Sequence, residues 1–509
     1  MAELPDYLKQ GDVARLIPAG AANQKERSAC SVLLSSLRVV QPYARTIFGE
    51  IRQKVGNGAS IDAYTEAIFK IQPEGLNCRH DGLLILDTGR RQWRAIVESK
   101  IGTCKIEPEQ LAQYARLARA NKVNAIITIS NELTPRPDHI PYAVPKEIRN
   151  LELYHWSWPY LAMRADLLLG ADLDFDYEQN FILREVVRYL DHDSTDIKCF
   201  TQMPSGWSPL IQRIGAAAST PRGDPDLMEA VRSWHQAQAS ICIRLTRELQ
   251  LPVTPHLSRG HRDDQDLRLS EEAAEFAADH VLRASFDFPK LPASIEVVAN
   301  ALARNVICRF WVDARQDRQR YQARLRWLIN QLPAESDPSA VITCVWDRGV
   351  KSDATLGQLR ENLNAARIDG AGAGPAYFEI ATVSVLGSRF VGTKNFVPAV
   401  EEAVRHFYET IARHIRPWQG HAAEEDVVTE ESAEVDDQAT TAEPKRKIVK
   451  RGEVAGRAYS IYEDGSIEIQ TGNGVQRFNS FAELTAAAAA KNGHADGSRP
   501  SGRGSSSTL

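Results

Sequence analysis

The stretch that decides the fold runs from Asp81 to Tyr114 and reads DGLLILD (81–87), AIVESK (95–100) and QLAQY (110–114). Two apolar runs are separated by a tight turn around Thr88-Gly89-Arg90, which predicts a β-hairpin. A helix is predicted over 108–121, because proline is favoured at the first position of a helix. An acidic residue opens the first strand, and an acid and a lysine close the second. The stretch therefore predicts a hairpin and a helix that present charged groups together.

The charged groups of the hairpin form a candidate catalytic set. Glu98 and Lys100 lie two positions apart on a strand, so their side chains point to the same face of the sheet. Asp81, at the start of the neighbouring strand, can meet them there. Two carboxylates at one point suit Mg²⁺ or Mn²⁺, which prefer oxygen ligands. A metal held in this way, with a lysine beside the attacking water, suits the hydrolysis of a phosphodiester. We predict Asp81, Glu98 and Lys100 as catalytic residues, with the two acids as metal ligands.

Side chains on either side of this set are candidates for contacts with a nucleic acid. Gln110 and Tyr114 are four positions apart, hence on one helical face, where they can hold the DNA backbone or a metal-bound water. Arg79, Arg90 and Arg91 flank the hairpin and can contact phosphates. A solvated hairpin tip explains the arginines almost equally well, so both interpretations remain open.

The segments around the hairpin predict a mixed α+β core. Helices are predicted from Lys25 and after Pro42, followed by a strand at 67–69, the hairpin, the helix at 108–121, a buried strand at 125–129 and a last strand at 151–156. The predicted order is therefore helix, helix, three strands, helix and two strands.

This order, with Asp81, Glu98-Ser99-Lys100 and Gln110-Leu111-Ala112-Gln113-Tyr114, resembles the PD-(D/E)XK (restriction-endonuclease-like) nuclease superfamily and its RecB-like branch with a QxxxY motif. The resemblance covers residues 25–160 and departs from the usual Pro-Asp, because His80 precedes Asp81. It implies a Mg²⁺-dependent or Mn²⁺-dependent nuclease with a mixed central sheet. The family often adds an upstream acid to the site. Glu66 is the first candidate for this third metal ligand, with Glu50 and Glu26 as alternatives.

The rest of the chain is predicted to form separate parts. Residues 1–22 are expected to be a loosely held arm, 23–170 the nuclease-like domain, and 171–416 a helical and then mixed α+β domain of unknown role. An acidic, disordered linker is predicted at 417–450. A small β-hairpin and helix module follows at 451–490, because Asp464-Gly465 between alternating strands is a strong hairpin signal. A disordered tail is predicted at 491–509.

Composition bounds the class of protein. The chain has 509 residues, 43% of them hydrophobic and 25% charged, which is ordinary for a globular protein of two to four domains. The net charge of −5 gives no general signal for nucleic-acid binding. Seven cysteines without a CxxC pair indicate reduced thiols. No apolar run approaches the ~18 residues of a membrane span, so we expect no membrane partner and a cytoplasmic location.

Together these features predict a metal-dependent hydrolase acting on DNA, in a role such as bacterial defence or repair. The alternative is a catalytically silent nuclease-fold module that binds DNA or protein in a stress-response assembly. A third hypothesis gives the main activity to residues 290–416, where no site can be named. A homodimer and a protein partner of the C-terminal module are compatible with the sequence.

Overall fold

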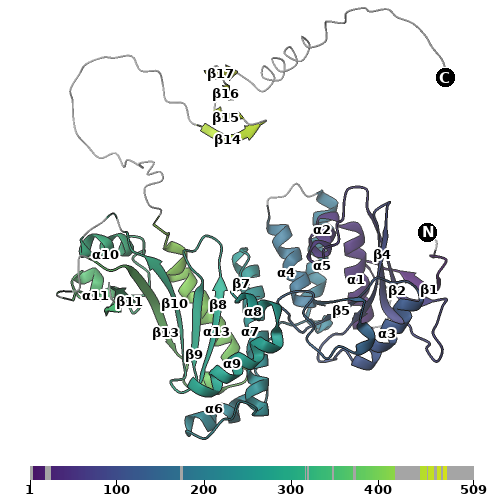
Figure 1. Ribbon diagram of the computed structural model, residues 1–509, viewed down its shortest axis with the longest axis horizontal. Coiled ribbons are helices and arrows are strands. Elements are labelled where there is room, and N and C mark those ends of the chain that lie inside the picture. Colours follow the sequence, from purple (N-terminus) through teal and green to yellow (C-terminus); the bar gives the residue numbers. More distant parts are fainter. Residues whose placement is uncertain are drawn as a thin grey trace, which may run out of the picture. The chain divides into compact units, whose positions relative to one another are not determined.

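The computed structural model describes two units of the chain, residues 1–423 and 424–509, which are treated separately (Figure 1). The described residues are 4–17, 24–171, 176–315, 317, 320–346, 349–368, 370, 374–418 and, in the second unit, the strands at 448–454, 457–462, 467–471 and 474–478. Among them, no helix is both long and apolar enough to cross a membrane. The seven cysteines are all free.

The first sheet has its strands in sequence order. They are β1 (Leu8–Val13), β2 (Ser60–Phe69), β3 (His80–Asp87), β4 (Gln92–Ser99), β5 (Ala125–Ser130) and β6 (Glu152–Ser157). The pairs from β1 to β4 are antiparallel, whereas β4, β5 and β6 are parallel. A parallel pair needs a crossover connection, and α3 (Pro108–Ala120) supplies it between β4 and β5. The predicted mixed α+β class is confirmed.

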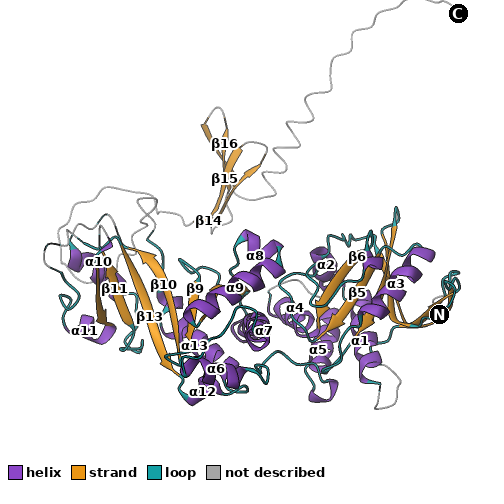
Figure 2. Cartoon of the chain, turned by 60° about the horizontal axis from the view of Figure 1, so that its bottom comes forward, coloured by secondary structure: helices purple, strands orange, loops and turns teal. Residues whose placement is uncertain are grey.

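Helices cover both faces of this sheet (Figure 2). On one face lie α1 (Lys25–Val39), α2 (Gln41–Glu50), α4 (Trp158–Gly170) and α5 (Tyr177–Leu190). The opposite face packs against α3. Successive strand residues alternate between the two cores: Val97 packs with α1, and Ile96 packs with α3. The strands are apolar on both sides for this reason, as the run Leu83 to Leu86 predicted.

Two predicted boundaries of the first domain are wrong. The loosely held arm expected at 1–22 contains β1, which pairs with β2 and therefore extends the sheet. The domain also continues past residue 170, because Leu183, Val186 and Leu190 of α5 are buried in the same core as α1 and α4. Composition could not locate this boundary, since α5 is an ordinary amphipathic helix that could pack on either neighbour.

A second sheet follows. It is antiparallel, in the order β12-β11-β13-β10-β9-β8-β7. Its strands are β7 (Thr254–Pro255), β8 (Val281–Asp287), β9 (Ile295–Asn300), β10 (Asn305–Asp313), β11 (Val341–Val345), β12 (Lys351–Thr355) and β13 (Tyr377–Val385). The sequence also predicts strands near 294–300, 305–313, 340–346 and 377–386, and the structure confirms these four as β9, β10, β11 and β13. The strands β7, β8 and β12 were not predicted.

The helices of this region share one large core with the sheet. They are α6 (Trp207–Gly215), α7 (Pro225–Leu249), α9 (Gln265–Asp279), α10 (Tyr321–Ile329), α11 (Leu356–Glu361), α12 (Ser388–Val391) and α13 (Phe396–Thr410). The short helix α8 (Arg259–Asp263) has no buried residue and packs against α9. Short 3₁₀ helices are η1 (Lys146–Ile148), η2 (Asp193–Thr195) and η4 (Ala412–His414). The long helix α7 begins after Asp224, whose side chain caps it by accepting from Leu227 N. α7 is buried in the core of the second sheet and contacts both α4 and β8. It therefore links the first part of the unit, the first sheet with its helices, to the second part, the second sheet with its helices (residues 199–418).

The second unit contains an antiparallel sheet of β14 (Ile448–Val454), β15 (Arg457–Tyr462), β16 (Ile467–Thr471) and β17 (Gly474–Phe478). The predicted hairpin around Asp464-Gly465 corresponds to β15 and β16. The strand β14 begins at residue 448, inside the segment predicted as linker. The helix predicted in the C-terminal module, residues 419–447 of the linker and the tail lie outside the described residues.

Candidate active site

The register of the first sheet sets Asp81 against Glu98. Gly82 pairs with Val97 at the end of the β3–β4 ladder, so the next residues, Asp81 and Glu98, face each other. Directly opposed side chains on antiparallel strands have Cβ atoms about 5 Å apart. Asp81 Oδ2 also accepts hydrogen bonds from Ser99 N at 2.8 Å and Ser99 Oγ at 3.2 Å. The two predicted acids are therefore neighbours, and Asp81 is oriented by the backbone of β4.

Helix α3 adds two donors to Glu98. Gln110 Nε2 donates to Glu98 Oε1 at 2.7 Å, and the Tyr114 hydroxyl donates to Glu98 Oε2 at 2.6 Å. Gln110 Nε2 and Tyr114 OH are themselves 3.0 Å apart. The two side chains share one helical face, as predicted, and both reach the same carboxylate, which was not predicted. The structure thus brings Glu98, Gln110 and Tyr114 together.

Lys100 completes the set and connects it to α1. Its Nζ donates to Glu98 Oε1 at 2.5 Å and to Glu26 Oε1 at 3.3 Å. The backbone of Lys100 is held as well, because its N donates to Ile129 O at 2.7 Å and its O accepts from Trp158 Nε1 at 2.9 Å. The lysine is consequently fixed at the end of β4, between two carboxylates.

The electrostatics of the set are dominated by burial. The Glu98 side chain is 1% exposed, and its desolvation, together with the charge of Asp81, raises its pKa to about 7 despite the nearby Lys100. Burial also raises the pKa of Glu26, which Lys100 partly offsets. For Lys100, burial alone would lower the pKa, but the charges of Glu98, Asp81 and Glu26 outweigh it and raise the pKa. A cation beside Glu98 would favour its ionised form.

The three upstream acids occupy different positions. Glu26, in the first turn of α1, contacts Lys100. Glu50 binds Arg164 and Tyr160, away from the set. Glu66 forms an ion pair with Arg79 at 2.7 Å. Glu66 was the first candidate, but the acid that contacts Lys100 is Glu26, because α1 packs across the sheet with its first turn beside the end of β4.

Glu66 nevertheless has an unusual backbone. Its φ is +53°, and the β1–β2 register shifts by one residue at this point, which defines a β-bulge. The bulge changes which face the strand presents: Tyr64 and Ala67, three positions apart, both pack toward α3. Thr65 pairs with Gly82 and Ala67 with His80, so Glu66 lies opposite Asp81. At the bulge, the Glu66 carboxylate forms its ion pair with Arg79, the residue directly before β3.

The predicted arginines are not a single group. Arg79 lies at the same end of β3 as Asp81, and its side chain is 63% exposed. Arg90 and Arg91 lie in the turn at the opposite end of the hairpin. Strands rise about 3.3 Å per residue, so β3 separates Arg90 from Asp81 by roughly 20 Å. Arg91 also donates to Gln53 Oε1 at 2.8 Å. The structure therefore places only Arg79 beside the set.

The surroundings of Asp81 are closely packed. His80, which replaces the proline of the resemblance, is fully buried and stacks on Phe69, and burial lowers its pKa to about 3. His80 is therefore a neutral core residue. On the other face, a Cβ at Gly82 would approach Leu34 Cδ1 to 2.6 Å. Only glycine here allows α1, and with it Glu26, to pack so closely on β3.

The donor set suits a hard divalent cation. Asp81, Glu98 and Glu26 offer carboxylate oxygens at one sheet end, and these are the ligands that Mg²⁺ and Mn²⁺ prefer. As they stand, however, no three His, Cys, Asp or Glu side chains in the described part of the chain are close enough together to hold one ion. Lys100 Nζ lies between Glu98 and Glu26. The predicted metal ligands remain a prediction, with Glu26 as the upstream acid in reach.

Sequence reasoning missed some of the residues that shape the set. Ser99, Ile129 and Trp158 fix Asp81 and the Lys100 backbone through hydrogen bonds. An acid in the first turn of the helix before the sheet was a usable signal for Glu26, whereas no pattern in the sequence linked Trp158 to the Lys100 backbone. No family model, curated protein or solved structure matches this chain.

Proposed function

We propose that this chain is a metal-dependent nuclease that hydrolyses phosphodiester bonds of DNA. One observation carries the proposal: Glu98, buried at the end of β4, is joined by Lys100, Gln110 and Tyr114 and faces Asp81. Residues from two strands and a helix meet there in the arrangement that the resemblance implies. Structural ion-pair networks also perturb pKa values, so the raised pKa of Glu98 supports the proposal together with this geometry and not by itself.

The carboxylates would hold the cation. Asp81 and Glu98, with Glu26 as the third acid, would bind Mg²⁺ or Mn²⁺. Such a cation, when bound, polarises the scissile phosphate and lowers the pKa of water. Glu98 must be ionised to serve as a ligand, and its raised pKa makes this step sensitive to pH near neutrality.

Lys100 would act on the attacking water or on the negative charge that develops on the phosphate. Its pKa is raised, so it stays protonated at neutral pH and can donate hydrogen bonds. Gln110 and Tyr114 would orient Glu98, since each donates to one of its two oxygens. Arg79, exposed beside the set, would contact a phosphate of the DNA.

The direct test is cleavage of DNA. The purified full chain is incubated with linear, circular and single-stranded DNA and with Mg²⁺ or Mn²⁺. We expect metal-dependent cleavage by the wild type, none with chelator, and a loss of at least 100-fold on Lys100→Ala, in line with the removal of one charge-stabilising group. Lys351→Ala, at an exposed lysine of the edge strand β12, serves as the control and should cut as well as wild type. Equal cutting by Lys100→Ala would refute the catalytic role.

A second candidate function also has an observation in its favour. Both oxygens of Glu98 already accept hydrogen bonds from side chains, which suits a catalytically silent module that binds DNA or protein. Calorimetric titration with Mn²⁺ separates the two candidates. Binding by wild type that is lost in Asp81→Asn supports the nuclease. No binding at millimolar Mn²⁺ supports the silent module.

A further inference from the structure

The loop after β5 contacts both sides of the candidate site. Ile129 O, at the end of β5, accepts the Lys100 N–H at 2.7 Å. Two residues later, Asn131 Nδ2 donates to Gly102 O at 3.3 Å and to Asp196 O at 2.8 Å. Gly102 follows Lys100 by two positions. The turn that carries Lys100 is therefore hydrogen-bonded to residues 129–131.

The same loop reaches the α1 side of the site through Asp196. The Asp196 carboxylate forms an ion pair with Lys25 at 2.6 Å, and Lys25 directly precedes Glu26 in the first turn of α1. Asn131 thus connects the Lys100 turn to the segment that holds the start of α1. Lys100 Nζ contacts Glu98 and Glu26. Glu98 is on β4, which pairs with β5 just before this loop, and Glu26 follows Lys25, which is paired with Asp196.

The loop is in turn held by the second part of the unit. Leu133 N donates to Gln236 Oε1 at 2.7 Å, and Gln236 Nε2 donates to Leu133 O at 2.7 Å. Gln236 is on α7, so one amide side chain satisfies both polar groups of one loop residue. The Leu133 side chain is also buried against Met163 of α4 and Ile243 of α7.

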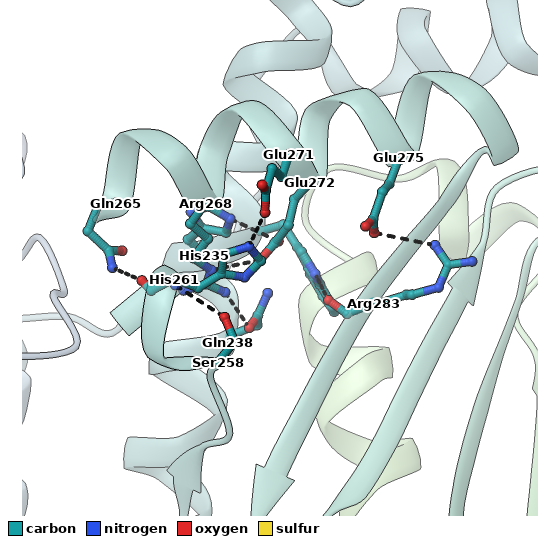
Figure 3. Close-up of polar contacts among 11 residues, drawn as sticks. His235, Gln238, Ser258, His261, Gln265, Arg268, Glu271, Glu272, Glu275 and Arg283 are labelled. Carbon is teal, nitrogen blue, oxygen red and sulfur yellow. Dashed lines mark hydrogen bonds and ion pairs between the residues drawn. The ribbon is translucent and has the colours of Figure 1, made fainter. Parts of the chain in front are cut away.

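Helix α7 is fixed in its own core on both sides of Gln236. Figure 3 shows His235 and Gln238 directed toward α9, where His235 Nε2 lies 3.0 Å from Glu272 Oε2 and Gln238 Oε1 accepts from Arg268 Nη2 at 2.8 Å. Trp234, fully buried, donates to Arg283 O of β8 at 2.8 Å. The position of Gln236 is therefore set by the second sheet and its helices.

We propose that Gln236 is a positioning residue through which the second part of the unit, residues 199–418, holds the Lys100 turn in place. It acts through Leu133 and Asn131 and touches none of the catalytic candidates itself. The assignment gives residues 199–418 a role that their own sequence does not reveal. Its consequence for catalysis rests on the proposed function, but its structural part does not.

The test compares two variants of α7 in the full chain. Gln236→Met keeps the side-chain length but removes both bonds to Leu133. Arg247→Met is the matched control, because Arg247 joins α7 to Asp166 and Asp191 across the same seam without touching the loop. Hydrogen–deuterium exchange then reports on the Leu133 and Lys100 amides in each variant.

We expect the Lys100 amide to exchange about tenfold faster in Gln236→Met than in wild type, since losing two hydrogen bonds of ordinary strength corresponds to about thirtyfold at Leu133 itself and part of that change reaches Lys100. In Arg247→Met its exchange should stay within about twofold of wild type. Faster exchange confined to Leu133, or equal acceleration by both variants, would overturn the proposal: the effect would then end at the loop or reflect a general loosening of the seam.

Cleavage assays separate this inference from the proposed function. If the wild type cuts DNA, Gln236→Met should lower the maximal rate and leave the DNA concentration for half-maximal rate nearly unchanged. The reason is that the Lys100 turn acts at the reacting phosphate and contributes little to binding the rest of the DNA. If the wild type does not cut, the exchange result still decides whether Gln236 positions the turn. If the Lys100 amide exchanges faster in Gln236→Met and the wild type does not cut DNA, the positioning role of Gln236 is supported and the proposed nuclease function is rejected.

Discussion

The Tyr114 hydroxyl donates to Glu98 Oε2 over 2.6 Å, and both groups are almost completely withdrawn from solvent. Tyr114 is on α3 and Glu98 is on β4, and a turn connects these two elements. The phenol reaches the Glu98 carboxylate, which is buried at the end of β4. A buried carboxylate without donors is costly, so this bond and those from Gln110 and Lys100 make the ionised form of Glu98 tolerable.

Tyr114→Phe should destabilise the protein mainly when Glu98 is ionised. Removing the hydroxyl leaves Glu98 Oε2 without its donor, a change worth about 1–3 kcal/mol for a charged acceptor. The loss should be measured by urea unfolding at pH 8 and should shrink at pH 5.5. Tyr43→Phe is the comparison, because Tyr43 donates to the neutral carbonyl of Leu161, and its loss should be the same at both pH values. Identical pH behaviour of the two variants would contradict this account.

Glu98→Gln should flatten the pH dependence of stability. Burial raises the pKa of Glu98 from 4.5 to about 7 in the folded chain, so the folded state holds a proton that the unfolded state releases. The free energy of unfolding of wild type should therefore fall as the pH rises from about 4.5 to about 7, by roughly 3 kcal/mol if the full shift is realised. Unfolding experiments from pH 4.5 to pH 8 measure the slope, and a slope unchanged in Glu98→Gln would show that other groups cause it.

The three upstream acids should differ in their effect on metal binding. Glu26→Gln should weaken Mn²⁺ binding, by about tenfold if Glu26 is a ligand or orients one. Glu50→Gln should leave the affinity unchanged, since Glu50 binds Arg164 elsewhere. Glu66→Gln tests the original prediction, because Glu66 lies opposite Asp81 but is paired with Arg79. Calorimetry ranks the three, and a larger loss for Glu66→Gln than for Glu26→Gln would restore Glu66 as the third ligand.

Gly82→Ala should loosen α1 from the sheet. The added methyl would come within 2.6 Å of Leu34 Cδ1 and 3.2 Å of Val97 Cβ, and such overpacking costs about 1–3 kcal/mol. Gly58→Ala is the control, since a Cβ there meets nothing within 4 Å. Thermal unfolding gives the stabilities. If Gly82→Ala proved as stable as Gly58→Ala, the close approach of α1 would not be required.

Local patterns in the sequence were sufficient for the strands and the helix of the candidate site. The two-residue period placed Glu98 and Lys100 at one sheet end, and the four-residue period placed Gln110 and Tyr114 on one helical face. These relations involve neighbours in sequence, so elementary geometry determines them. The pairing of Asp81 with Glu98 followed from a tight hairpin turn, which fixes the register of its strands.

Relations between distant segments could not be predicted in this way. The choice of Glu26 over Glu66 depends on where the first turn of α1 packs and on a bulge that shifts one strand by one residue. The pairing of β1 with β2 and the packing of α5 on α1 depend on which apolar faces meet, and amphipathic patterns do not name their partners. The bonds of Gln236 to Leu133 join residues 103 positions apart, and no motif announces them.

The placement of α5 has a practical consequence for anyone who expresses part of this chain. A fragment that stops after Gly170, where the composition suggests a natural end, would lack Leu183, Val186 and Leu190 and would expose the apolar surface of α1 and α4 that they cover. Such an exposed patch favours aggregation. Inclusion bodies from that fragment would report a misplaced cloning boundary and would say nothing about whether the candidate site can cut DNA.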